Sequence, residues 1–139
     1  MQKKFIILFL LSFLLISIMN CGKSFEPNHL YGNWTLSKVD CQSPELTEEV
    51  KNSGIQLNLE KQSDGQYGKI IGKFPLNGEI KEFQGKFTAK YDKDIDKMEL
   101  IFSTQDIENN KLYIHSLSNS EMQTGETIKD VYCKIDLKK

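Results

Sequence analysis

Histidine, cysteine and aspartate are the residues in this sequence whose side chains could catalyse a reaction or bind a metal, and their spacing limits both possibilities. The chain has two histidines, His29 and His115. Only His115 lies well inside the region expected to fold, and no Ser–His–Asp or Cys–His arrangement surrounds it. Neither histidine stands at metal-ligand spacing from a cysteine. We therefore expect a protein that is not an enzyme, with no metal and no cofactor, and we interpret His115 as a solvated or hydrogen-bonded strand residue.

A second candidate for chemistry is a run of alternating carboxylates. Asp92, Asp94 and Asp96 follow the spacing of calcium-loop ligands. Lys93 and Lys97 interleave with them, and the rest of a calcium loop, including its terminal glutamate, is missing. We interpret this run as a solvated turn.

The N-terminus carries the clearest functional signal. Lys3 and Lys4 precede an apolar run from Phe5 to Met19. This run is shorter than the roughly 20 residues that a membrane-spanning helix needs, and it fits the hydrophobic region of a secretory signal. The segment Ile18-Met19-Asn20-Cys21 resembles a bacterial lipobox. We expect cleavage before Cys21 and lipidation of Cys21 with acyl chains such as palmitate; an uncleaved signal anchor is the alternative.

This reading divides the chain into a signal peptide (1–20), a lipidated tether (21–29) and one folded domain (30–139). Multiple acyl chains anchor a protein to a membrane without any apolar protein surface. Gly22 and Lys23 after the lipidated cysteine include no inner-membrane retention aspartate, which favours the outer membrane of a diderm cell. The expected location is therefore the cell envelope.

Charge argues against one class of partner. The net charge is −1, and it becomes more negative once Lys3 and Lys4 leave with the signal. All basic residues are lysines, so the chain lacks the arginine guanidinium groups that bind phosphates through two parallel hydrogen bonds. We expect no nucleic-acid partner and a monomeric protein.

Cys41 and Cys133 remain once Cys21 is lipidated. An even pair of cysteines in an exported domain is a disulfide candidate, because compartments outside the cytoplasm are oxidising. Cys41 ends the first strand-like segment and Cys133 lies in the last one, so a bridge would tie the two ends of the domain and stabilise it by a few kcal/mol. Two buried free thiols are the alternative.

Alternating polar and apolar residues predict an all-β domain. The clearest example runs from Phe83 to Tyr91, and Asn77-Gly78 is a strong hairpin signal before it. Further strands are expected near 30–41, 55–60, 67–74, 98–102, 112–117 and 131–137, with a weak segment around Gly125. Seven or eight short antiparallel strands suit a small barrel or sandwich, and an up-and-down barrel removes exposed edges.

One segment has helical character. Ser43 can cap a helix running to Asn52, and Pro44 suits its first position. Gly54 can end it in the left-handed conformation. We expect a short helix after the first strand.

The opening strand supplies a family resemblance. Leu30-Tyr31-Gly32-Asn33-Trp34-Thr35-Leu36 resembles the Gly-x-Trp strand of the lipocalin-like families, in which the Trp sits at the closed base of the barrel. The segments 112–118 and 121–122 are similar to the late strand pair of bacterial lipocalin-like domains, and Tyr132-Cys133-Lys134 to their last strand. The resemblance implies a lipocalin-like barrel; the arginine that packs over the Trp in those families has no counterpart in this sequence.

Aromatic side chains are the candidate ligand site within such a barrel. The set predicted to line a hydrophobic pocket is Trp34, Phe74, Phe83, Phe87, Tyr91 and Phe102. Small eight-stranded barrels are either packed solid or just wide enough for one small ligand, so core filling is the alternative. The leading hypothesis is a non-catalytic binding module for a small hydrophobic ligand. The alternative is a surface protein-interaction module, such as an enzyme inhibitor or an adhesin.

Overall fold

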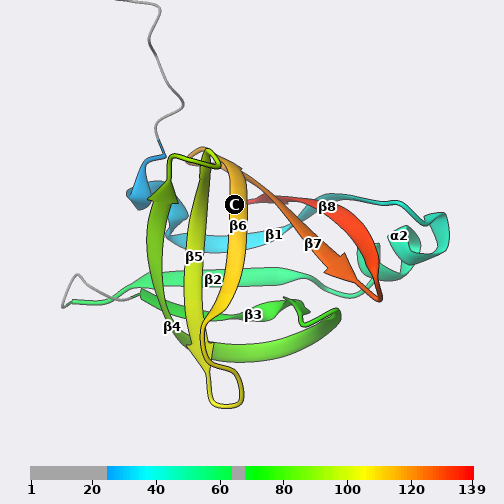
Figure 1. Ribbon diagram of the computed structural model, residues 1–139, viewed down its shortest axis with the longest axis horizontal. Coiled ribbons are helices and arrows are strands. Elements are labelled where there is room, and N and C mark those ends of the chain that lie inside the picture. The colour runs from blue at the N-terminus through cyan, green and yellow to red at the C-terminus, as the bar shows by residue number, and fades with distance from the viewer. Residues whose placement is uncertain (1–24, 64–67) are drawn as a thin grey trace, which may run out of the picture.

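Eight antiparallel strands follow one another around a closed barrel, each paired with the next and β8 paired back to β1 (Figure 1). This computed structural model describes residues 25–63 and 68–139. The elements are η1 (Pro27–Leu30), β1 (Gly32–Cys41), α2 (Pro44–Lys51), β2 (Gln56–Lys61), β3 (Gly68–Leu76), β4 (Glu79–Asp92), β5 (Lys97–Thr104), β6 (Asn110–Leu117), β7 (Glu121–Ile128) and β8 (Val131–Lys138). The predicted all-β up-and-down barrel with a short helix after its first strand is confirmed.

The signal peptide, Cys21 and the first residues of the tether lie outside the described residues, so cleavage and lipidation stay predictions. None of the helices within the described ranges has the length and apolarity to span a membrane.

Buried and more exposed residues alternate along the strands, as the two-residue period of a β-strand requires. In β5, Met98, Leu100 and Phe102 are buried, while the residues between them are half-buried. Because successive side chains in a strand point to opposite faces, this alternation places one face of every strand on a common core. The predicted hairpin is present at Asn77 and Gly78, which have φ angles of 51° and 83°. Positive φ at both central residues is the geometry of the tight turns that match strand twist.

The predicted helix is also present. Pro44 begins α2, and the backbone N–H of Leu46 donates to the Ser43 side chain. Leu46 and Val50 are buried, so α2 covers the edge of the core beside β1.

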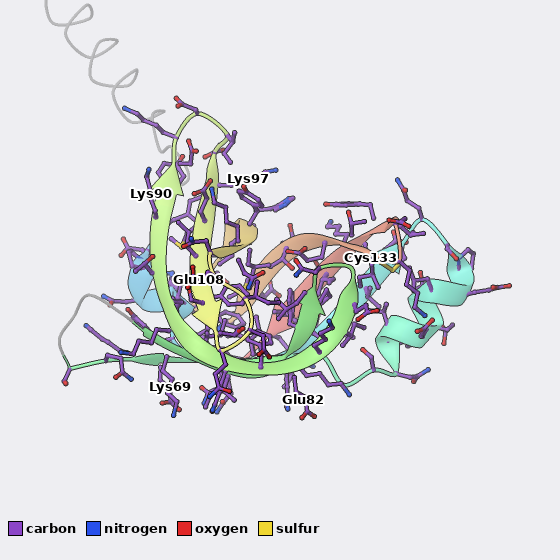
Figure 2. All side chains as sticks on the ribbon, turned by 60° about the horizontal axis from the view of Figure 1, so that its bottom comes forward. Lys69, Glu82, Lys90, Lys97, Glu108 and Cys133 are labelled. Atoms are coloured by element: carbon purple, nitrogen blue, oxygen red, sulfur yellow. A yellow bond between two sulfur atoms is a disulfide. The ribbon has the colours of Figure 1, made fainter. Side chains whose placement is uncertain are left out.

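The predicted disulfide joins Cys41 at the end of β1 to Cys133 near the start of β8, with Cα atoms 4.0 Å apart. These two residues face each other in the β1–β8 register. Cys133 lies at the end of the barrel next to α2 (Figure 2). We call this end, which also holds the β3–β4 and β7–β8 turns, the α2 end, and the opposite one the η1 end.

The η1 end is closed by packing around Trp34, which is fully buried. Its indole Nε1–H donates to the carbonyl oxygen of Leu30 at 2.7 Å. The Lys139 ammonium lies 4.6 Å from the centre of the Trp34 ring and donates to the carbonyl oxygen of His29 at 2.7 Å. A lysine from the C-terminus thus covers the tryptophan, and burial lowers the pKa of that lysine.

Part of the segment interpreted as a tether packs on the barrel. Phe25 is half-buried against the core, and its ring centre is 5.2 Å from that of Tyr91. Residues Pro27–Leu30 form η1, with Leu30 buried. Contacts with the barrel therefore include residues of the segment 25–29, which the sequence assigns to the tether.

Candidate binding site

The aromatic residues predicted to line a pocket separate into two groups. Four of them, Trp34, Phe74, Phe87 and Phe102, are at most 3% exposed and belong to one continuous core. Tyr91 is 42% exposed at the η1 end, where its hydroxyl donates to Asp96. Phe83 is half-buried, and its ring stacks on Phe102 with centres 5.2 Å apart.

The barrel wall has a first gap between β4 and β5. Pairing between these strands begins only at Gly85 opposite Thr104. The first six residues of β4, 79–84, pair with β3 alone. At the parting point, a Cβ on Gly85 would collide with the Ser103 carbonyl oxygen. Glycine therefore permits a close backbone approach just where the strands separate.

A second gap separates β6 from β7. Their pairing covers Leu117 to Ile114 on β6 and stops opposite Thr124 on β7. The first half of β6 stays paired with β5, and the second half of β7 stays paired with β8. Figure 1 shows the two strands diverging toward the α2 end.

The β5–β6 turn stands between the two gaps. It is braced by its own hydrogen bonds: the Thr104 N–H donates to the Ile107 carbonyl at 2.9 Å, and the Ile107 N–H donates to Thr104 Oγ1 at 3.2 Å. The β3–β4 turn lies opposite and is tied to the β7–β8 turn, because the Lys129 N–H donates to the Gly78 carbonyl at 2.9 Å. The α2 end is thus built from turns rather than from a continuous wall.

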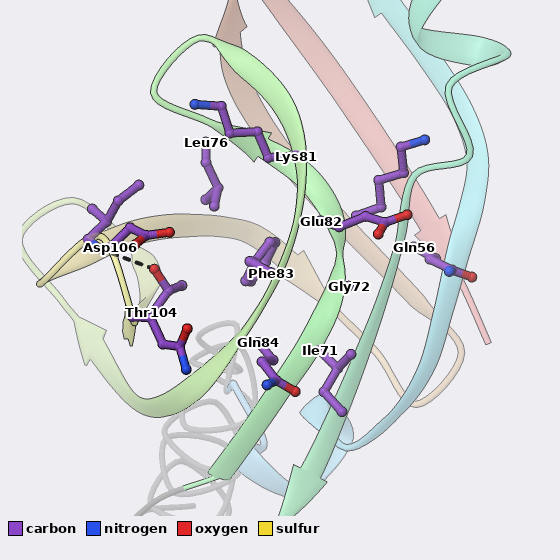
Figure 3. A pocket seen from close by; sticks show the side chains of 13 residues that line it. Gln56, Ile71, Gly72, Leu76, Lys81, Glu82, Phe83, Gln84, Thr104 and Asp106 are labelled. Carbon is purple, nitrogen blue, oxygen red and sulfur yellow. Dashed lines mark hydrogen bonds between the residues drawn. The ribbon is translucent and has the colours of Figure 1, made fainter.

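A cleft of about 640 Å³ occupies the first gap, and we call it the Phe83 cleft (Figure 3). Phe83 lies between the β3–β4 hairpin and the β5–β6 turn, with Leu76 beside it. Ile71 and Ile107 add apolar surface. The polar members of the lining are Gln56, Lys73, Lys81, Glu82, Gln84, Thr104, Gln105 and Asp106. The result is an amphipathic site with an aromatic ring at its centre.

A cleft of about 470 Å³ occupies the second gap, and we call it the Glu126 cleft. Glu126 lines it together with Asn110, Tyr113 and Tyr132. Burial raises the pKa of the Glu126 carboxyl to about 7. Leu76 borders both clefts, so they adjoin at this residue.

Sequence reasoning missed Glu126 and Asn110. The signal that could have found Glu126 is its parity: it shares the inward positions of β7 with Met122, Thr124 and Ile128, all of which are buried. A charged residue at an inward position is unusual and marks a functional candidate. The alternation around Gly125 is too weak to reveal this parity without the strand register.

The remaining candidates from the sequence stay apart from both clefts. His115 is half-buried on β6, and burial lowers its pKa, with Lys97 and Lys134 lowering it further. Asp92 and Asp94 form an exposed turn in which the Asp94 N–H donates to the Asp92 carboxylate. Within the part of the chain that the structure describes, no group of three or more His, Cys, Asp or Glu side chains is placed to hold a metal ion.

No family model, curated protein or solved structure matches this chain.

Proposed function

We propose that this chain is an envelope lipoprotein, anchored through Cys21, whose lipocalin-like barrel is a non-catalytic binding module for a small hydrophobic ligand. The observation that carries the proposal is the Phe83 cleft, an opening in the barrel wall of about 640 Å³ with a half-buried aromatic ring inside it. Small-molecule sites commonly have volumes of about 300–1,000 Å³ and combine apolar walls with a few polar groups.

Burial favours a ligand at the mouth of the barrel over one near its base. Trp34 and Phe74 are at most 1% exposed, so side chains occupy the core near them. Phe83 and Leu76, by contrast, offer apolar surface to the cleft. The polar side chains around them suit the polar end of an amphipathic molecule.

The anchor gives this site an orientation. Phe25 packs at the η1 end and stands four positions after Cys21, a distance of at most about 14 Å in an extended chain. A lipid on Cys21 would therefore hold the η1 end near the bilayer. Both clefts would face away from the membrane, toward whatever the protein binds.

A photoaffinity experiment tests the proposal. The full chain in lipid nanodiscs is incubated with a neutral alkyl diazirine, irradiated and mapped by peptide mass spectrometry. Labelling is expected on the β3–β4 hairpin and the β5–β6 turn, and it should fall several-fold in Phe83→Ala. The matched control is Ile95→Ala, because Ile95 is 46% exposed on the β4–β5 turn at the other end. If Phe83→Ala is labelled as strongly as the wild type, the proposal of a small ligand in this cleft is wrong.

A protein partner is the second candidate function, and the free edge of β4 favours it. Among the described residues, 79–84 have no backbone partner on the side away from β3. Exposed strand edges can accept an extended peptide as an added strand. A partner bound in this way would protect the amides of residues 79–84 from hydrogen exchange. If the partner is an enzyme such as lysozyme, which this chain would inhibit, the chain should lower lysozyme activity, and unchanged activity would exclude lysozyme as the partner.

A further inference from the structure

Two polar side chains in the Glu126 cleft point to a ligand, because the described residues supply no hydrogen-bond partner for Asn110 Nδ2 and no ion pair for Glu126. The Asn110 Nδ2 atom is buried and has no hydrogen-bond partner. Glu126 has no ion pair with any described residue, although burial raises its pKa to about 7. Buried polar groups in native proteins are nearly always paired, so each exception calls for a physical reason. A bound ligand is one such reason.

Strand register places both side chains on the inner face of the barrel. Asn110 lies opposite the buried Phe102, and Glu126 lies opposite the buried Cys133. At this height β6 and β7 no longer pair, so the wall that would otherwise separate these polar groups from the outside is open. The cleft thus connects inward-facing polar groups with the surface.

Two tyrosines from the outer face frame the opening. Tyr113 and Tyr132 both line the cleft. A Cβ on Gly125 would collide with the Tyr132 ring, so glycine at this position lets the ring lie across β7 toward the gap. The site therefore combines aromatic faces with hydrogen-bonding groups.

The charges around the cleft select the kind of ligand. Asn110 Nδ2–H needs an acceptor and the Glu126 carboxylate needs a donor, while the Lys111 ammonium, 3.8 Å from a Glu99 carboxylate oxygen, adds positive charge beside them. A cation would satisfy Glu126 but nothing else, and it would be repelled by Lys111. An anion would be repelled by ionised Glu126. A hydroxyl group both donates and accepts, so it suits Asn110 and both protonation states of Glu126.

We propose that the Glu126 cleft binds a neutral polyhydroxyl ligand, namely a sugar residue. Its hydroxyls pair with Asn110 and Glu126, and the apolar face of its ring rests on Tyr132. The site is distinct from the Phe83 cleft, across Leu76, and the two can be tested separately.

Saturation-transfer NMR with the full chain in nanodiscs tests this. The ligands offered are glucose, N-acetylglucosamine and its disaccharide, with tetramethylammonium and acetate as the competing chemistries and empty nanodiscs as the blank. Saturation transfer to at least one sugar is expected. Transfer to the two ions should not exceed that seen with empty nanodiscs. Transfer to an ion without any sugar, or to no sugar at all, overturns the proposal.

Variants locate the binding. Asn110→Ala should weaken sugar binding about fivefold to tenfold, since one buried hydrogen bond is lost. Tyr132→Leu should weaken it about fivefold, and folding should survive because Tyr132 is 42% exposed. The matched control is Tyr91→Leu, at the same 42% exposure on the far end of the barrel, and it should change nothing. Equal binding by Tyr132→Leu and Tyr91→Leu would overturn the assignment of the site.

Glu126→Gln separates a sugar site from a cation site. A glutamine still donates and accepts hydrogen bonds, so sugar binding should stay within about threefold of the wild type. Glu121→Gln, on the exposed face of the same strand, is the control. Loss of sugar binding in Phe83→Ala but not in Asn110→Ala would assign the sugar to the Phe83 cleft instead and would contradict this inference.

Discussion

At the η1 end of the barrel, Trp34 is fully buried under Leu30 and Lys139, whereas at the α2 end two gaps open in the wall on either side of Leu76. The η1 end is closed by side-chain packing within a continuous sheet. The α2 end is held by a few discrete ties: the Cys41–Cys133 disulfide, the Lys129–Gly78 backbone bond and the Lys129–Glu49 ion pair at 2.6 Å.

The difference shows how a small barrel keeps both a stable core and an open site. Pairing of every strand through its whole length would seal the barrel, as small barrels tend to be filled by their own side chains. Here β4 and β6 each leave one neighbour before the α2 end. Polar groups such as Glu126 are exposed in the gaps that result, and discrete ties replace the missing pairing.

The disulfide is expected to have the largest effect. Cys41→Ser with Cys133→Ser should lower the free energy of unfolding by about 4 kcal/mol, because the bridge spans a sequence separation of 92 residues and restricts the unfolded chain. Denaturant titration measures this. If packing alone holds the η1 end, hydrogen exchange should rise first around α2 and the β7–β8 turn. An equal rise in hydrogen exchange at both ends would contradict this difference between them.

The ionisation of Glu126 is expected to have the second-largest effect on the free energy of unfolding. Its pKa of about 7 lies above the ordinary 4.5, so the folded state binds its proton more tightly than the unfolded state. The free energy of unfolding therefore falls as pH rises from about 4.5 through 7, by up to about 3 kcal/mol.

Glu126→Gln isolates this contribution, because the variant should lack the fall in stability seen in the wild type. His115 acts in the opposite direction: its pKa is lowered on folding, so its contribution rises with pH. Subtracting the Glu126→Gln stability curve from the wild-type curve cancels the contribution of His115. Two parallel curves would show that burial does not raise the pKa of Glu126.

At the η1 end, Trp34→Phe should cost about 2 kcal/mol. The smaller ring leaves unfilled volume, and the Leu30 carbonyl loses the indole N–H that donates to it. Thermal and chemical unfolding measure the loss. Sugar and probe binding at the α2 end should not change, and a large change there would show that the two ends are coupled.

The smallest effect is expected from Lys139→Met, at about 1 kcal/mol. This change removes the ammonium that lies over the Trp34 ring and donates to His29, while keeping an apolar chain of similar length. Lys138→Met is the control, because the neighbouring Lys138, the last residue of β8, is exposed. Equal stability of both variants would show that the lysine over Trp34 contributes nothing.

Local patterns predicted much of the frame. Alternation predicted most strands, and Asn77-Gly78 and Ser43-Pro44 predicted a turn and a helix, because these signals depend on neighbouring residues alone. The two-residue turn at Lys129 and Asp130 also has positive φ angles, 48° and 65°, but its residues carry no such signal. There the pairing of β7 with β8 imposes the conformation.

The sequence by itself predicted the antiparallel strands, the helix after the first strand and Cys41 with Cys133 as a disulfide candidate, since each follows from period, capping chemistry or cysteine count. Only the tertiary structure decided which residues face the clefts. The points where β4 leaves β5 and where β6 leaves β7 are visible only in the strand pairing of the folded barrel. Those two partings expose Phe83 and Glu126, the residues on which both proposed sites rest.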